Sequence, residues 1–279
     1  MGSKSILVAI TLISCLPICA TAAPAEGPST AGQDQYFQAT ERTLANGAPV
    51  DKLDGGMTLL IAAAAAGRAD VVKLLLDHGA NPNLHADASM EGATAIHAAA
   101  GMGAVDVVSL LIDRGVSVDS TDLLGMTPLS LASIQGKTRV IALLYARGAN
   151  VNSAPPNGMT PLHYAAGGGH RDAVALLIAL GANITAKDSD GRTPYDLAAK
   201  STDLTPNDRA AVLAWLAPAN VAASAPPAAQ QVHGCPHTAE DLAWFYGRLL
   251  QADPETRKHP AEAAMTVDNE LKQMGCPGQ

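Results

Sequence analysis

A Gly-x-Thr triplet recurs five times along this chain, and its regular spacing constrains the fold more than any other feature. Successive glycines lie 36, 33, 33 and 33 residues apart, at Gly56, Gly92, Gly125, Gly158 and Gly191. A second glycine keeps the same register, at Gly79, Gly115, Gly148 and Gly181. A fixed period of this length predicts a stack of similar units, each too small to bury an apolar face alone.

The unit from Asn157 to Asn183 shows the local pattern most clearly. Thr160 followed by Pro161 predicts a helix start, because threonine caps a helix and proline suits its first turn. Apolar residues at helical spacing predict a first helix that the glycines 167–169 stop. A second apolar stripe follows, and Gly181 is expected just beyond the end of that helix. Each unit is therefore expected to be a pair of short helices.

The Thr-Pro-Leu-His motif at 160–163, with its period of 33 residues, resembles the ankyrin repeat. The resemblance implies an all-α solenoid of helix-turn-helix repeats with β-hairpin fingers. The copies are imperfect, since the histidine position holds Ile61, His97, Ser130, His163 and Asp196. In this family the histidine has a structural role, so we interpret His97 and His163 as structural rather than as ligands.

The repeat boundaries follow from the motif register. The ankyrin domain is expected at 36–217, with a half-repeat cap at 36–51, full repeats at about 53–83, 89–119, 122–152 and 155–185, and a C-terminal cap at 188–216. Segment 84–88 carries the three extra residues of the first spacing and is expected to lengthen one finger.

The resemblance also implies a binding surface, formed by the fingers and the inner face of the first helices. Charge is nearly absent from the positions expected there. The candidate partner-binding residues are Met57, Met90, Leu123, Leu124, Met126, Ile134, Gln135, Met159 and Arg192. Methionine adapts to varied partners, so this composition favours a protein surface or a hydrophobic peptide as ligand. Two alternatives are that small residues are merely tolerated there, or that residues 244–246 of the same chain cover the surface.

The N-terminus reads as an export signal over residues 1–22. Lys4 precedes an apolar stretch that is too short to span a bilayer, and Ala20-Thr21-Ala22 forms a cleavage site. We therefore expect an exported protein, periplasmic or secreted, and the compact signal looks bacterial. A lipobox-like sequence ending at Cys15 is the alternative and would add a lipid anchor. Residues 23–35 are expected to be a disordered tether.

The C-terminal part has a different composition. Residues 218–232 read as an Ala/Pro linker, and residues 233–279 as a helical hairpin of no recognised family. An exported chain that loses its signal cysteines keeps only Cys235 and Cys276, which favours a disulfide closing that hairpin. The alternative is a metal site at His233, Cys235 and His237.

Composition and motifs narrow the function. A net charge of −8, with only 18 Lys and Arg, argues against nucleic-acid binding. No Ser-His-Asp spacing, phosphate-binding loop or His-Glu-x-x-His helix occurs in the sequence. We expect a non-catalytic protein-interaction module without a cofactor, possible subclasses being inhibitors and immunity-type proteins. The alternative is a metal-binding or enzymatic protein that uses the His-x-Cys-x-His segment.

Overall fold

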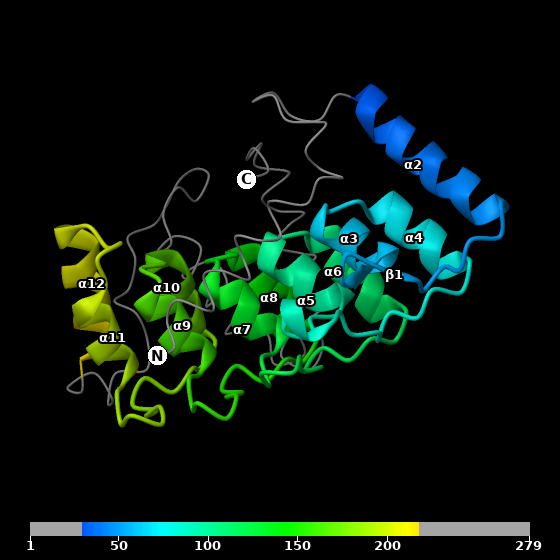
Figure 1. The fold of residues 1–279 in the computed structure, drawn as a ribbon. Coiled ribbons are helices and arrows are strands. Elements are labelled where there is room, and N and C mark those ends of the chain that lie inside the picture. Colours follow the sequence, from blue (N-terminus) through cyan, green and yellow to red (C-terminus); the bar gives the residue numbers. More distant parts are fainter. Residues whose placement is uncertain (1–29, 218–279) are drawn as a thin grey trace, which may run out of the picture. The chain divides into compact units, whose positions relative to one another are not determined.

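The computed structural model describes residues 30–217, with side chains from residue 37 onward (Figure 1). These residues form two compact units. The first contains residues up to 99 together with 106–116, and the second contains residues 100–105 together with those from 117 onward.

The first unit consists of short helices and one small hairpin. Its elements are α2 (Thr30–Ala45), β1 (Leu53–Asp54), β2 (Met57–Thr58), α3 (Leu59–Ala65), α4 (Ala69–Asp77), the 3-10 helix η1 (Ala88–Met90), most of α5 (Ala95–Met102) and most of α6 (Val105–Asp113). Strands β1 and β2 pair antiparallel, with Leu53 opposite Thr58. Helix α2 begins inside the segment expected to be a disordered tether, because Thr30–Ala45 is rich in good helix formers such as alanine, glutamine and glutamate.

The second unit is a double layer of helix pairs. Its helices are α7 (Pro128–Ile134), α8 (Thr138–Ala146), α9 (Pro161–Gly167), α10 (Arg171–Ala179), α11 (Pro194–Lys200) and α12 (Pro206–Leu216). The first helices of the pairs contact one another in the order α7, α9, α11, and the second helices in the order α8, α10, α12. Leu129, Leu144, Leu162 and Leu177 are fully buried between these layers. The expected all-α repeat fold is thus present in this unit.

The helix starts follow the sequence signals. Thr127, Thr160 and Thr193 are N-caps in extended conformation, and a proline occupies the first turn after each of them. The Thr127 hydroxyl accepts the N–H of Ser130 at 3.2 Å. At the other end, Gly181 follows the cap of α10 with φ +89°, as the sequence predicted.

Side chains at the end of one repeat bind the backbone of the next. The N–H of Asn183 donates to Asn152 Oδ1 at 2.8 Å, and the N–H of Asn150 donates to the carboxylate of Asp119 at 3.2 Å. In the first unit, the N–H of Asn81 donates to Asp51 in the same way at 2.9 Å. These bonds lie at exposed positions, and they tie each repeat to its neighbour and fix the register between them.

The β-hairpin fingers are only partly as expected. Within residues 30–217, strands form at the first finger alone, and the later fingers are turns. The finger with the extra residues contains the 3-10 helix η1, and the N–H of Asp87 donates to the Gly56 carbonyl at 2.8 Å. None of the described helices has the length and apolar character needed to cross a bilayer.

Candidate partner-binding site

The turn from Asp122 to Met126 holds two leucines in solvent. The Asp122 carboxylate is buried, and its Oδ1 accepts the N–H of Leu124 at 2.9 Å and that of Met126 at 2.8 Å. The backbone closes the same turn, with the Asp122 N–H donating to the Met126 carbonyl at 3.1 Å. Leu123 and Leu124 remain 63% and 44% exposed. The turn is therefore fixed by its base, and its tip presents an apolar pair.

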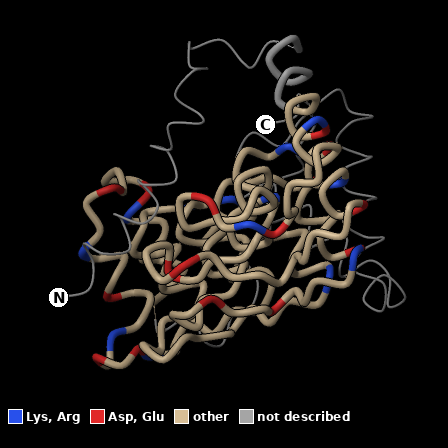
Figure 2. Tube along the Cα trace, turned by 45° about the vertical axis from the view of Figure 1, so that its right-hand side comes forward, with Lys and Arg blue, Asp and Glu red and all other residues tan. Residues whose placement is uncertain are grey.

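Three finger tips lie in a row in the second unit. A Cβ placed on Gly125 would lie 2.8 Å from Pro156 Cδ, so the first of these fingers touches the second. The N–H of Ser189 donates to the Asn157 carbonyl at 2.9 Å, so the second touches the third. The tips are 123–124, 156–157 and 189–190, and we call this row the finger ridge. Charged residues are a minority along the described trace, as Figure 2 shows.

The third finger, from Asp188 to Arg192, is closed by an aspartate at its base in the same way, but its tip is charged. Asp188 Oδ1 accepts the N–H of Asp190 at 3.0 Å and that of Arg192 at 2.8 Å. The Arg192 guanidinium reaches both carboxylates, at 2.7 Å from Asp188 and 2.8 Å from Asp190. Burial alone would raise the pKa of Asp188, but the hydrogen bonds from Arg192 outweigh it and the pKa is lowered. Arg192 therefore acts as an internal clamp, and the surplus negative charge lies on Asp190, whose side chain is 66% exposed.

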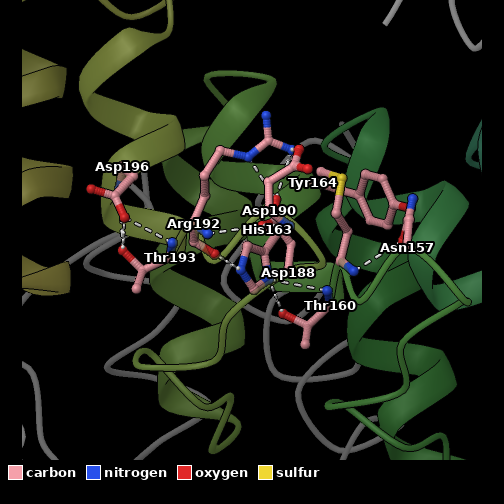
Figure 3. A network of polar contacts seen from close by, with 10 residues as sticks. Asn157, Thr160, His163, Tyr164, Asp188, Asp190, Arg192, Thr193 and Asp196 are labelled. Atoms are coloured by element: carbon pink, nitrogen blue, oxygen red, sulfur yellow. Dashed lines mark hydrogen bonds and ion pairs between the residues drawn. The ribbon is translucent and has the colours of Figure 1, made fainter. Parts of the chain in front are cut away.

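His163 joins two repeats below the ridge. Figure 3 shows its ring between Thr160 and Arg192. Its Nδ1 accepts the N–H of Thr160 at 3.1 Å, so the proton belongs on Nε2, which donates to the Arg192 carbonyl at 3.1 Å. Burial lowers the pKa of His163. This imidazole is fully buried and fully hydrogen-bonded, which is the geometry of a structural residue rather than a ligand.

Two methionines expected on the open surface are buried instead. Met57 and Met126 are each only 4% exposed. The Tyr164 hydroxyl, itself buried in the next repeat, donates to the Met126 sulfur at 3.1 Å. Burial also raises the pKa of that phenol, although a hydrogen bond with Asn157 opposes the rise. Met126 is thus a packing residue, and the expectation that its side chain faces a partner is corrected.

The remaining candidates do not form one patch. Ile134 and Gln135 lie at the far end of α7 from its finger, and the Ile134 carbonyl accepts His170 Nε2 at 2.6 Å. Met159 is half-buried, and Met90 belongs to the first unit. The structure brings together only the tip residues Leu123 and Leu124, with the other tips of the finger ridge beside them.

Asp122 and Asp188 were not among the sequence candidates, although they position the tips. The sequence does contain a pattern that could have identified them, because each lies three residues before the glycine of a Gly-x-Thr triplet. A short carboxylate at that offset can accept N–H groups two and four residues further on, as in an Asx turn.

Several candidates lie outside the described residues: His233, Cys235, His237 and Cys276, and with them the predicted disulfide and the metal alternative. Across residues 30–217, no cluster of three or more histidine, cysteine, aspartate or glutamate side chains is arranged to hold a metal ion.

Comparison with protein families identifies a matching family. A sequence model described as ankyrin repeats in three copies matches residues 30–122, 84–155, 111–188 and 129–220, which together make up more than half of the chain. A comparison with curated proteins gave no match.

Proposed function

Given that this chain belongs to the ankyrin-repeat family, we propose that it is an exported, non-catalytic module that binds a partner protein through the finger ridge. Ankyrin repeats in general serve as protein-interaction modules. The signal-like residues 1–22 support export to the periplasm or the exterior. An inhibitor or immunity-type role fits an exported binding scaffold.

The observation that carries this proposal is the leucine pair at one rigid tip. Fully burying a leucine contributes about 1.5–3 kcal/mol, and both side chains expose much of their area. Asp122 holds the turn, so little conformational entropy is lost when a partner covers the tip. Apolar side chains on a preorganised support, with polar neighbours around them, are the pattern of an interaction hot spot.

The test replaces this tip by the tip of the third finger, which has the same base. Leu123→Ser with Leu124→Asp copies Ser189-Asp190 onto a turn that Asp122 still closes. Partner capture from the native cell envelope should fall at least tenfold, while the circular dichroism stays unchanged. Lys73→Ser, an exposed change on α4, is the control and should capture normally. Equal capture by the tip variant and the wild type would place the binding site elsewhere.

A second measurement distinguishes the interaction module from the alternative of a metal-binding protein. Mass spectrometry of the non-reduced mature protein should show a Cys235–Cys276 bond and no bound metal. Free thiols with a retained metal ion would instead favour the His233, Cys235 and His237 site. The same spectrum reports the N-terminus, which should be Ala23 after simple cleavage, whereas lipidation would leave a modified Cys15.

A further inference from the structure

The exposed leucine pair has a matching segment within the same chain. The sequence contains two Trp, two Phe and five Tyr in 279 residues, and Trp244, Phe245 and Tyr246 are consecutive. These residues lie outside the described part of the chain. Aromatic side chains bury the largest apolar areas of all residues, so three in a row form a strong apolar anchor.

We infer that residues 242–250 bind the finger ridge of the same molecule, with the three aromatic residues on Leu123 and Leu124. This contact covers the surface that the proposed function assigns to a partner, so the inference rests on that proposal. A partner must then displace the segment before it can bind.

The charges of the two surfaces are complementary. Residues 242–250 contain a single charged side chain, Arg248. Among the six tip residues of the ridge only Asp190 is charged, and its carboxylate is 66% exposed while it pairs with Arg192 at 2.8 Å. An apolar segment with one cation therefore meets an apolar tip with one net anion further along the same ridge.

The chain is long enough for this contact. Ala217 follows α12, which belongs to the same unit as the ridge. Packed helices lie about 8–10 Å apart, so the repeat that carries Leu123 lies about 16–20 Å from the repeat that carries α12. The residues from Ala217 to Trp244 could reach about 90 Å at full extension, at about 3.3 Å per residue. Joining the two surfaces in one chain also raises their effective concentration.

Photo-crosslinking of the purified full-length chain tests the contact without any partner. A benzoylphenylalanine at position 123 should, on irradiation, form a bond to residues 242–250 in molecules that migrate as monomers. The same probe at position 172, exposed on α10, is the control and should give less than a tenth of that product. Links to other segments, links found only in dimers, or equal yields from both positions would overturn the inference.

Variants of the segment add an independent readout. Trp244→Ser, Phe245→Ser and Tyr246→Ser together should lower the position-123 product at least tenfold. Arg248→Glu should lower it severalfold, and adding Asp190→Lys should restore it. Yields that do not respond to these changes would contradict the assignment.

Capture experiments keep this inference distinct from the proposed function. The aromatic triple variant should capture the partner severalfold better than the wild type, because the ridge is uncovered. If capture depends on Leu123 and Leu124 but the triple variant captures no better, the ridge binds a partner and the inference fails. If the crosslink forms but capture ignores the leucines, the proposed function fails alone.

Discussion

The Nε2 of His163 lies 3.1 Å from the carbonyl oxygen of Arg192, a residue 29 positions further along the chain. The other ring nitrogen accepts the N–H of Thr160, the residue that caps the histidine's own helix. One side chain therefore stabilises the start of its own helix and ties its repeat to the next finger. The bond to Thr160 is buried and the bond to Arg192 is partly buried, so losing them should lower the stability of the fold.

Replacing His163 by alanine should lower the free energy of unfolding by about 2–4 kcal/mol. The change leaves the Thr160 N–H without this partner, and an unsatisfied buried donor costs about 1–3 kcal/mol. The Arg192 carbonyl loses one of its two hydrogen bonds and keeps the one from the Asp188 N–H at 2.9 Å, and a lost hydrogen bond costs about 0.5–1.5 kcal/mol. Urea unfolding measures the difference. His78→Ala, at an exposed site after α4, should change stability by less than about 0.5 kcal/mol. Similar losses for both variants would show that the bridge between repeats contributes nothing specific.

Lowering the pH should reduce the stability of the fold because His163 is buried in its neutral form. Its pKa is below 6.5 in the folded state because burial disfavours the charged ring; Asp188 and Arg192 face it with opposing effects. As the pH falls, His163 is therefore protonated in the unfolded chain before it is protonated in the folded protein. The stability that this difference contributes is fully present above about pH 6.5 and is lost as the pH falls toward the pKa of the folded state. Urea midpoints between pH 7.5 and 5.0 should fall more steeply for the wild type than for His163→Asn. Parallel curves would contradict this origin.

Substituting two glycines distinguishes the cost of backbone strain from the cost of disturbed packing between repeats. Gly158 and Gly191 have φ of +74° and +75°, but a Cβ on Gly158 would lie 3.1 Å from Asp188 Cα, whereas one on Gly191 meets nothing within 4 Å. Gly191→Ala should cost about 1 kcal/mol for the left-handed conformation alone. Gly158→Ala should cost about 1–3 kcal/mol more, because the neighbouring finger is pushed away. Equal costs in thermal unfolding would mean that the fingers do not restrain each other.

Glutamate at two positions of one finger should have opposite consequences. Met126→Glu places a charge beside Tyr164 in a buried site and should cost about 3 kcal/mol or more. Leu124→Glu changes an exposed tip and should alter stability by about 0.5 kcal/mol or less. Chemical denaturation with matched circular dichroism spectra checks both. A stable Met126→Glu protein would restore that residue as a candidate for partner contact.

Local features were predictable because their causes are local. Thr160-Pro161 specifies a helix start within two residues, and Gly181 specifies an end by its backbone freedom, so both were correct from the sequence. The family match and the paired layers of the second unit agree with the repeat period.

Side-chain direction was less predictable, because it depends on the next repeat. Met126 occupies the same place in its triplet as Met159, yet Met126 is buried because Tyr164, 38 residues away, covers its sulfur. The missing strands have a similar origin. In these two fingers the carboxylates of Asp122 and Asp188 accept the backbone N–H groups of Met126 and Arg192. In a β-hairpin, the carbonyl groups of the paired strand would accept such N–H groups.

The buried aspartate at the base of a finger separates the backbone of the turn from the identity of its outer residues. Asp122 and Asp188 make the same two bonds although the intervening dipeptides are Leu-Leu and Ser-Asp. A library that randomises only positions 123, 124, 189 and 190 would therefore sample new chemistry on an unchanged frame. Affinity for a new ligand could be evolved in this protein without a parallel search for compensating stabilisation.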